Sequence, residues 1–157
     1  MEIRRAREQD MEGINHLLYQ VLTVHHNGRP DLFRANVKKY TDSELAAILA
    51  DDKRPIFVGT DETGRVLGYA FCVFEEHAGD NILMPVKTLY IDDLCVDETQ
   101  RGQHVGSRIY EHVLAFAKQA GCYNVTLNVW ECNPAAKSFY EAMGLVPYKT
   151  CMEQVLQ

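Results

Sequence analysis

The stretch LYIDDLCVDETQRGQHVGSR, from Leu89 to Arg108, decides the fold. Its first eight residues include Leu, Tyr, Ile, Cys and Val but no Gly or Pro, which predicts a strand in the interior of a sheet. A polar loop from Asp97 to His104 follows, and helical periodicity begins at Gly106. Free backbone N–H groups gather where a glycine-containing turn enters a helix, and the helix dipole adds roughly half a positive charge. The stretch therefore predicts an anion site; the alternative is a surface loop that only caps the helix.

Two adjacent carboxylates, Asp92 and Asp93, interrupt this apolar strand. A buried charge is unfavourable unless it is paired or used chemically, so the interruption indicates a specific role. Because side chains alternate along a strand, we expect the two carboxylates to face opposite sides of the sheet, with only one in a given cleft. One interpretation is a proton-transfer site, and the other is an ion pair with a nearby Lys or Arg.

Length and composition predict a single domain over residues 1–157. The chain is 46% hydrophobic and 24% charged, has no repeat or linker, and carries a net charge of −6. This charge argues against nucleic acid as the main partner and leaves cationic small molecules or peptides as substrates. The absence of a long apolar segment predicts a cytoplasmic protein with no membrane partner. The five cysteines form no CxxC pair, and we expect no metal site.

The remaining segments predict a mixed sheet covered by helices. The expected strands lie near residues 3–6, 55–60, 66–74, 86–96 and 123–129, and a tail at 148–156 is expected to add a closing strand. The expected helices lie near 10–28, from 41 or 43 onward, at 106–120 and at 133–145. A turn at 61–64 makes the second and third strands an antiparallel hairpin. The strand–helix–strand unit beginning at Leu89 predicts a parallel pair.

A second informative segment is NPAAKSFYEAMGL, from Asn133 to Leu145. Asn133 suits the N-cap of a helix, Pro134 its first turn, and Gly144 its C-terminal cap. The segment therefore predicts a short helix with both ends specified by the sequence.

The two segments together resemble the GNAT superfamily of N-acetyltransferases. The loop Arg101–Gly106 is similar to the family's acyl-CoA signature, Gln/Arg-x-x-Gly-x-Gly/Ala, with His104 where a Gly is usual. His adopts positive φ more readily than most residues, so we expect the turn to keep its shape. The later helix is similar to the family motif Asn-x-x-Ala-x-x-Phe-Tyr-x-x-x-Gly-Phe/Leu. The resemblance covers residues 89–145 and extends loosely to the N-terminal strand, helices and hairpin.

The resemblance implies an α/β fold with a mixed sheet of six to seven strands and flanking helices, antiparallel in its N-terminal half and with a parallel pair in the CoA-binding half. It also implies acetyl-CoA as the acyl donor, no metal, and a homodimer, which is common in the family. The residues that it assigns to the cofactor are Leu94, Cys95, Val96, Arg101, Gly102, Gln103, His104, Val105, Gly106, Ser107, Asn133 and Tyr140.

Acetyl transfer to an amine needs a base for the ammonium and an acid for the departing thiolate. In the polyamine-acetyltransferase branch of the family an acidic pair occupies this place, so Asp92 is the candidate base. The second motif makes Tyr140 the candidate acid. The alternative role for Tyr140 is that of an aromatic side chain packed in the core. The alternative role for Asn133 is to cap the helix without contacting the cofactor. The expected acceptor contacts are Asp92, Asp93, His25, Phe33 and Trp130.

Three functions are compatible with this resemblance. The first is an N-acetyltransferase that acts on the primary amine of a small molecule, such as a polyamine-like cation. The second is a GNAT enzyme that uses a protein α-amine or lysine, and the third is a non-catalytic acyl-CoA sensor. Asp92 and Tyr140 together favour catalysis over sensing. The lack of an added peptide-docking segment favours a small acceptor.

Overall fold

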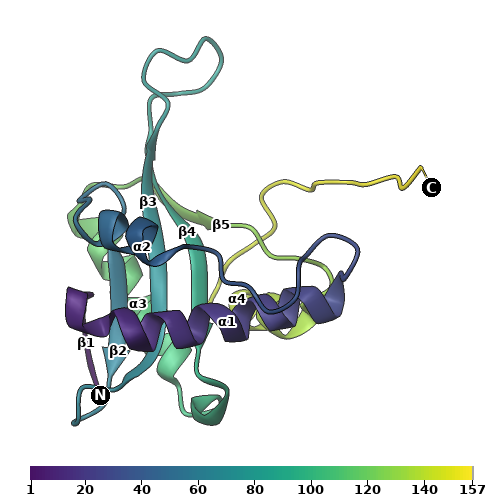
Figure 1. Ribbon diagram of the computed structural model, residues 1–157. Coiled ribbons are helices and arrows are strands. Elements are labelled where there is room, and N and C mark those ends of the chain that lie inside the picture. The colour runs from purple at the N-terminus through teal and green to yellow at the C-terminus, as the bar shows by residue number, and fades with distance from the viewer. Residues whose placement is uncertain (157) are drawn as a thin grey trace.

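The computed structural model describes residues 1–156, and this part of the chain contains one five-stranded sheet with helices on both faces (Figure 1). The strands are β1 (Glu2–Arg5), β2 (Ile56–Thr60), β3 (Val66–Glu76), β4 (Lys87–Val96) and β5 (Asn124–Leu127). The helices are α1 (Met11–Gly28), α2 (Asp42–Leu49), α3 (Val105–Gln119) and α4 (Pro134–Ala142), with short 3₁₀ turns at Glu8–Asp10 and Glu98–Gln100.

The strands lie in the order β1-β2-β3-β4-β5. Neighbours from β1 to β4 are antiparallel, and β4 pairs with β5 in parallel. The antiparallel first half, the parallel pair and the interior position of β4 are therefore confirmed. Within residues 1–156, no helix combines the length and the apolar character needed to cross a membrane.

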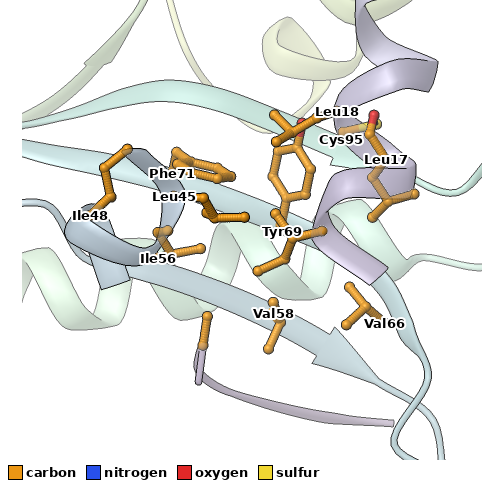
Figure 2. Close-up of a cluster of buried hydrophobic side chains, with 12 residues drawn as sticks. Leu17, Leu18, Leu45, Ile48, Ile56, Val58, Val66, Tyr69, Phe71 and Cys95 are labelled. Atoms are coloured by element: carbon orange, nitrogen blue, oxygen red, sulfur yellow. The ribbon is translucent and has the colours of Figure 1, made fainter. Parts of the chain in front are cut away.

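Each face of the sheet has its own apolar core. α1 and α2 cover one face, where the largest buried side chains include Tyr69 and Phe71 of β3 (Figure 2). α3 covers the other face, where Ile109 and Val113 pack against Leu89 and Ile91 of β4. The sheet thus forms the middle layer of three, and α4 adds partly buried side chains to the α3 side.

The sheet has fewer strands than expected. Five strands lie in residues 1–156 where six to seven were predicted, and the predicted closing strand at Tyr148–Leu156 is wrong: these residues run away from the sheet in extended, non-strand conformation (Figure 1). A strand needs a neighbour for its N–H and C=O groups, and this segment lies beside none. Its side-chain contact with the body is the ion pair of Glu153 with Arg29 (2.8 Å).

A β-bulge corrects the prediction that Asp92 and Asp93 face opposite sides of the sheet. Phe71 of β3 pairs with Asp93, but the next residue of β3, Cys72, pairs with Ile91. Asp92 is therefore an extra residue in β4, and the alternation of side chains changes phase there. As a result, both carboxylates lie on the α1–α2 face, where each accepts a hydrogen bond from a tyrosine.

Candidate functional site

β4 has one edge that β5 covers only in part. Its pairing with β5 ends at Ile91, whereas its pairing with β3 continues to Val96. Amides alternate in direction along a strand. Because the Asp97 amide donates to the Leu67 carbonyl on the β3 side (2.9 Å), the amides of Leu94 and Val96 point to the other edge. Two backbone donors therefore face the region where β5 has left β4.

The loop before α3 presents further backbone donors. Gly102 and His104 both adopt left-handed backbone conformations, with φ of 79° and 60°, and His104 is the N-cap residue of α3. The prediction that His tolerates this turn is confirmed. No backbone hydrogen bond of ordinary geometry within residues 1–156 uses the N–H groups of residues 101–107. Amides of this kind at the start of a helix form a donor site suited to a phosphate group.

The two predicted motifs lie against each other. A Cβ at Gly106 would lie 3.3 Å from the Val96 side chain and 3.4 Å from Phe139, so the glycine lets α3, β4 and α4 approach closely. Asn133 caps α4, because its Oδ1 accepts the amide hydrogen of Ala136 (3.2 Å). The predicted cap is confirmed, and the assignment of Asn133 to a cofactor stays a prediction.

Tyr140 is half-buried on α4, yet its hydroxyl is available. The hydroxyl has no hydrogen-bond partner within residues 1–156. Every fully buried side-chain N or O atom in that part of the chain has a partner, so the Tyr140 hydroxyl is not fully buried. The Tyr140 hydroxyl is therefore accessible from outside. Burial raises the Tyr140 pKa, and the nearby Asp93 and Cys95 raise it further, so the phenol lies close to the end of β4 and stays protonated at neutral pH.

The two carboxylates of β4 have different partners. Asp92 accepts the Tyr40 hydroxyl and forms an ion pair with Lys39, whose Nζ lies 2.9 Å from Oδ2. The alternative interpretation of the acidic pair, an ion pair with a nearby Lys or Arg, is therefore confirmed for Asp92. Asp93 accepts the Tyr69 hydroxyl (2.8 Å), and burial raises the pKa of Asp93 to about 6 against the opposing effect of that hydrogen bond.

Three predicted acceptor residues from distant parts of the sequence form an aromatic cluster. The rings of His25 and Phe33 lie 5.1 Å apart, and Phe33 meets Trp130 edge-on at 5.0 Å. The His26 ring holds the Phe33 carbonyl oxygen at 2.7 Å. Burial lowers the pKa of His25, and so does the charge of Lys39, the ion-pair partner of Asp92.

Sequence reasoning did not find the residues that surround the carboxylates. Tyr40 stacks on Phe71 at 5.4 Å, and Phe71 meets Tyr69 edge-on at 4.9 Å. Tyr69 and Phe71 are two positions apart in β3, so their side chains lie on the same face of the sheet. The sequence was enough to infer this shared face once the face of Asp93 was known. Lys39 and Tyr40 lie in the irregular segment between α1 and α2, where no periodic signal exists.

A separate hollow of about 410 Å³ lies at the opposite end of α1, where Asp10, His16, Arg65 and Asp97 contribute to its lining. It contains none of the predicted site residues. Residues 1–156 contain no group of three His, Cys, Asp or Glu side chains arranged to hold a metal ion.

The profile described as the GNAT acetyltransferase family matches residues 21–145, and the chain belongs to that family. It is an acyltransferase of the GNAT fold, and acetyl-CoA is the acyl donor that this family uses.

Individual relatives agree on the chemistry and differ in the acceptor. The chain is 32% identical to a probable glucosamine 6-phosphate N-acetyltransferase 2 of Oryza sativa subsp. japonica, over 93% of this chain and 82% of that protein. It is 24% identical to a peptidyl-lysine N-acetyltransferase, YjaB, of Salmonella typhimurium, over 92% and 82% of the two chains. A mutant of the BH1408 protein from Bacillus halodurans has 33% identity and a TM-score of 0.95, with both chains fully covered.

Proposed function

We propose that this enzyme transfers an acetyl group from acetyl-CoA to the primary amine of a small molecule by direct attack. The observation that carries the proposal is the end of β4–β5 pairing at Ile91, after which the amides of Leu94 and Val96 point to the edge of β4 that β5 does not cover. An extended pantetheine chain needs backbone donors of this kind, and a thioester carbonyl needs one near its oxygen.

In this proposal the amides of residues 101–107 bind the CoA diphosphate. The exposed Arg101 and Gln103 add polar side chains to the same loop. The pantetheine then follows the Leu94–Val96 edge, and the thioester lies near Tyr140. Asn133, at the start of α4, contacts the cofactor from the other side of the gap.

Asp92 is the proposed base. Its side chain is 20% exposed, and it lies where β5 leaves β4, so an acceptor amine reaches it from solvent. Tyr140 is the proposed acid, because its raised pKa keeps the proton available for the thiolate. Asp93 accepts a hydrogen bond from Tyr69 and adds negative charge next to the proposed base, Asp92.

The acceptor site is proposed to lie between the carboxylates and the aromatic cluster of His25, Phe33 and Trp130. Two carboxylates attract a cationic amine, and aromatic faces stabilise it through cation–π contact. A polyamine and an amino sugar are both acceptors of this kind, and the Oryza sativa relative is named for glucosamine 6-phosphate.

A screen with acetyl-CoA tests this function. The acceptors are spermidine, glucosamine 6-phosphate and a lysine peptide, and the readout is free thiol. We expect one of the small amines to release thiol, and Asp92→Asn to lower that rate most below the pKa of the acceptor amine. Asp93→Asn is the matched comparison, because it removes the neighbouring carboxylate of the acceptor site and leaves the proposed base in place. A pH–rate profile that is unchanged in Asp92→Asn rejects Asp92 as the base.

The same screen separates the other functions. Turnover of the lysine peptide alone would favour a protein acceptor, as in the name of the Salmonella typhimurium relative. Tight CoA binding in calorimetry without thiol release for any acceptor would favour a sensor. No CoA binding would reject the whole proposal.

We also propose that the enzyme is a homodimer. The loop between β3 and β4 and the C-terminal tail both extend away from the sheet (Figure 1). Both segments carry exposed apolar side chains. Their exposed members are Ile82, Leu83, Met84, Val146, Tyr148, Met152, Val155 and Leu156. Ile82, Leu83 and Met84 are consecutive in the loop, and clustered exposed apolar side chains are typical of protein interfaces. Sedimentation velocity should give twice the chain mass, and a monomer at all concentrations contradicts the proposal.

A further inference from the structure

Lys39 places a primary amine on the carboxylate proposed as the catalytic base. It lies in the segment between α1 and α2, and its Nζ is 2.9 Å from Asp92 Oδ2 and 3.3 Å from the Asp92 carbonyl oxygen. The ammonium also lies 5.5 Å above the ring of Tyr40. The Lys39 side chain is 40% exposed, so it occupies a site that is open to solvent.

The position is the one that an acceptor amine must reach. Asp92 is the bulge residue just beyond Ile91, the last residue of β4 that pairs with β5. An acceptor ammonium bound to Asp92 would have the same charge, the same donors and the same partner as Lys39 has now. Holding a nucleophile beside its base turns a bimolecular attack into an intramolecular one, which favours reaction strongly when the geometry is right.

We propose that Lys39 is itself an acceptor, so that the acetyl-CoA-loaded enzyme acetylates its own Lys39 when no small amine is present. This inference rests on the proposed function, because it uses the same base, acid and acyl donor. It adds a modification site in the segment that borders the acceptor site.

The step balances in atoms and charge. The Lys39 ammonium gives a proton to Asp92, and the free Nζ attacks the thioester carbonyl carbon. The new N–C bond forms, the C–S bond breaks, and the thiolate takes a proton from Tyr140. The nitrogen loses its second proton as the tetrahedral intermediate collapses. After proton exchange with water, the products are acetylated Lys39, CoA thiol and one released proton.

Acetylation changes the acceptor site in a defined way. The amide that replaces the ammonium carries no charge, so the ion pair with Asp92 is lost and Tyr40 remains as the side-chain partner of that carboxylate. Lys39 also lowers the pKa of His25, and its neutralisation removes that effect. The modification therefore makes the site more negative and removes a tethered competitor of a cationic acceptor.

The neighbouring lysine is a matched internal control. Lys38 Nζ donates to Asn15 Oδ1 at 2.9 Å and forms an ion pair with Asp42, away from the β4 carboxylates. Further controls are the exposed lysines Lys53, Lys118 and Lys149, which chemical acetylation by the thioester would reach without help from the site.

The test is mass spectrometry of the full chain incubated with isotopically labelled acetyl-CoA and no amine. We expect one labelled acetyl group per chain, on Lys39, and no comparable label on Lys38. The rate should be first order and independent of protein concentration. It should fall roughly 100-fold in Tyr140→Phe, which removes the acid. In Lys39→Arg the label should be absent.

Three results overturn the inference: equal labelling of the exposed control lysines, labelling of Lys39 that Tyr140→Phe leaves unchanged, or a rate that rises with protein concentration. Thiol release with small amines, measured on the same preparation, separates the two proposals. Turnover of a small amine with unlabelled Lys39 rejects self-acetylation alone. Loss of both reactions, or of CoA binding, rejects the proposed function as well.

Discussion

The two edges of β4 are held in different ways. Toward β3, the strand is paired from Lys87 to Val96, with one bulge. Toward β5, four residues pair and the neighbour then departs. The continuous edge satisfies the backbone and fixes which face each side chain occupies, whereas the interrupted edge leaves donors free. One strand thus supplies both the framework and the candidate site.

The bulge connects the two edges. It lies on the β3 side, opposite the Phe71–Cys72 step, but it turns Asp92 toward the face that Asp93 already occupies. The bulge in the β3–β4 pairing therefore places both carboxylates on one face of the sheet. They lie next to Ile91, where the β4–β5 pairing ends. We expect the paired edge of β4 to determine stability and the open edge to determine catalysis.

The largest expected effect is on the open edge. Tyr140→Phe should lower kcat by roughly 100-fold, because the thiolate loses its proton donor. The dissociation constant of CoA should change by less than about threefold, since the ring and its packing remain. Steady-state kinetics and calorimetry measure the two quantities. Equal losses in kcat and CoA affinity would make Tyr140 a binding residue instead.

The next effect is on the paired edge. A Cβ at Gly68 would lie 2.9 Å from the Cys95 carbonyl oxygen and 2.9 Å from Ile109. Gly68→Ala should therefore lower the free energy of unfolding by about 2–3 kcal/mol, measured by denaturant titration.

Gly102→Ala is the matched control for this change. A Cβ there has no atom within 4 Å, but φ is 79°, so we expect a loss of about 1 kcal/mol from backbone strain alone. The comparison fails if Gly68→Ala is no less stable than Gly102→Ala.

A third prediction concerns pH. Burial raises the pKa of Asp93 to about 6, so the folded protein binds this proton more tightly than the unfolded chain does. The ionised carboxylate therefore lowers stability, and the loss develops as pH rises from about 4 to about 6. Asp93→Asn should raise the free energy of unfolding at pH 7 by up to about 2 kcal/mol and change it little near pH 4. A less stable Asn variant at pH 7 would contradict this.

The smallest expected effect is at the turn before α3. His104 has a φ of 60°, which is unfavourable for a residue with a Cβ. His104→Gly should raise the free energy of unfolding by about 0.5 kcal/mol and tighten CoA binding, because the diphosphate can approach the backbone more closely. His104→Ala keeps a Cβ and should show neither gain. Weaker CoA binding in His104→Gly would show that the imidazole itself contacts the cofactor.

Local signals explain why much of the fold was predictable. The helix that begins near residue 41, the cap at Asn133, the apolar run of β4 and the turn before α3 all follow from short stretches of sequence. The tail was predicted wrongly because its apolar residues suit a strand, but pairing depends on a neighbour that local sequence does not reveal. The acidic pair was misplaced for a similar reason, since the bulge is set by the register of two strands.

The sequence by itself determined the class of fold and the turn before α3, because these depend on residues close together in the chain. The candidate acid and base are what the resemblance of two short motifs to the GNAT family implies. The tertiary structure decided which face Asp92 uses, that Lys39 and Tyr40 bind it, and that His25, Phe33 and Trp130 meet. Those contacts join residues as much as 97 positions apart, as Phe33 and Trp130 are, and their geometry follows from strand register and helix packing.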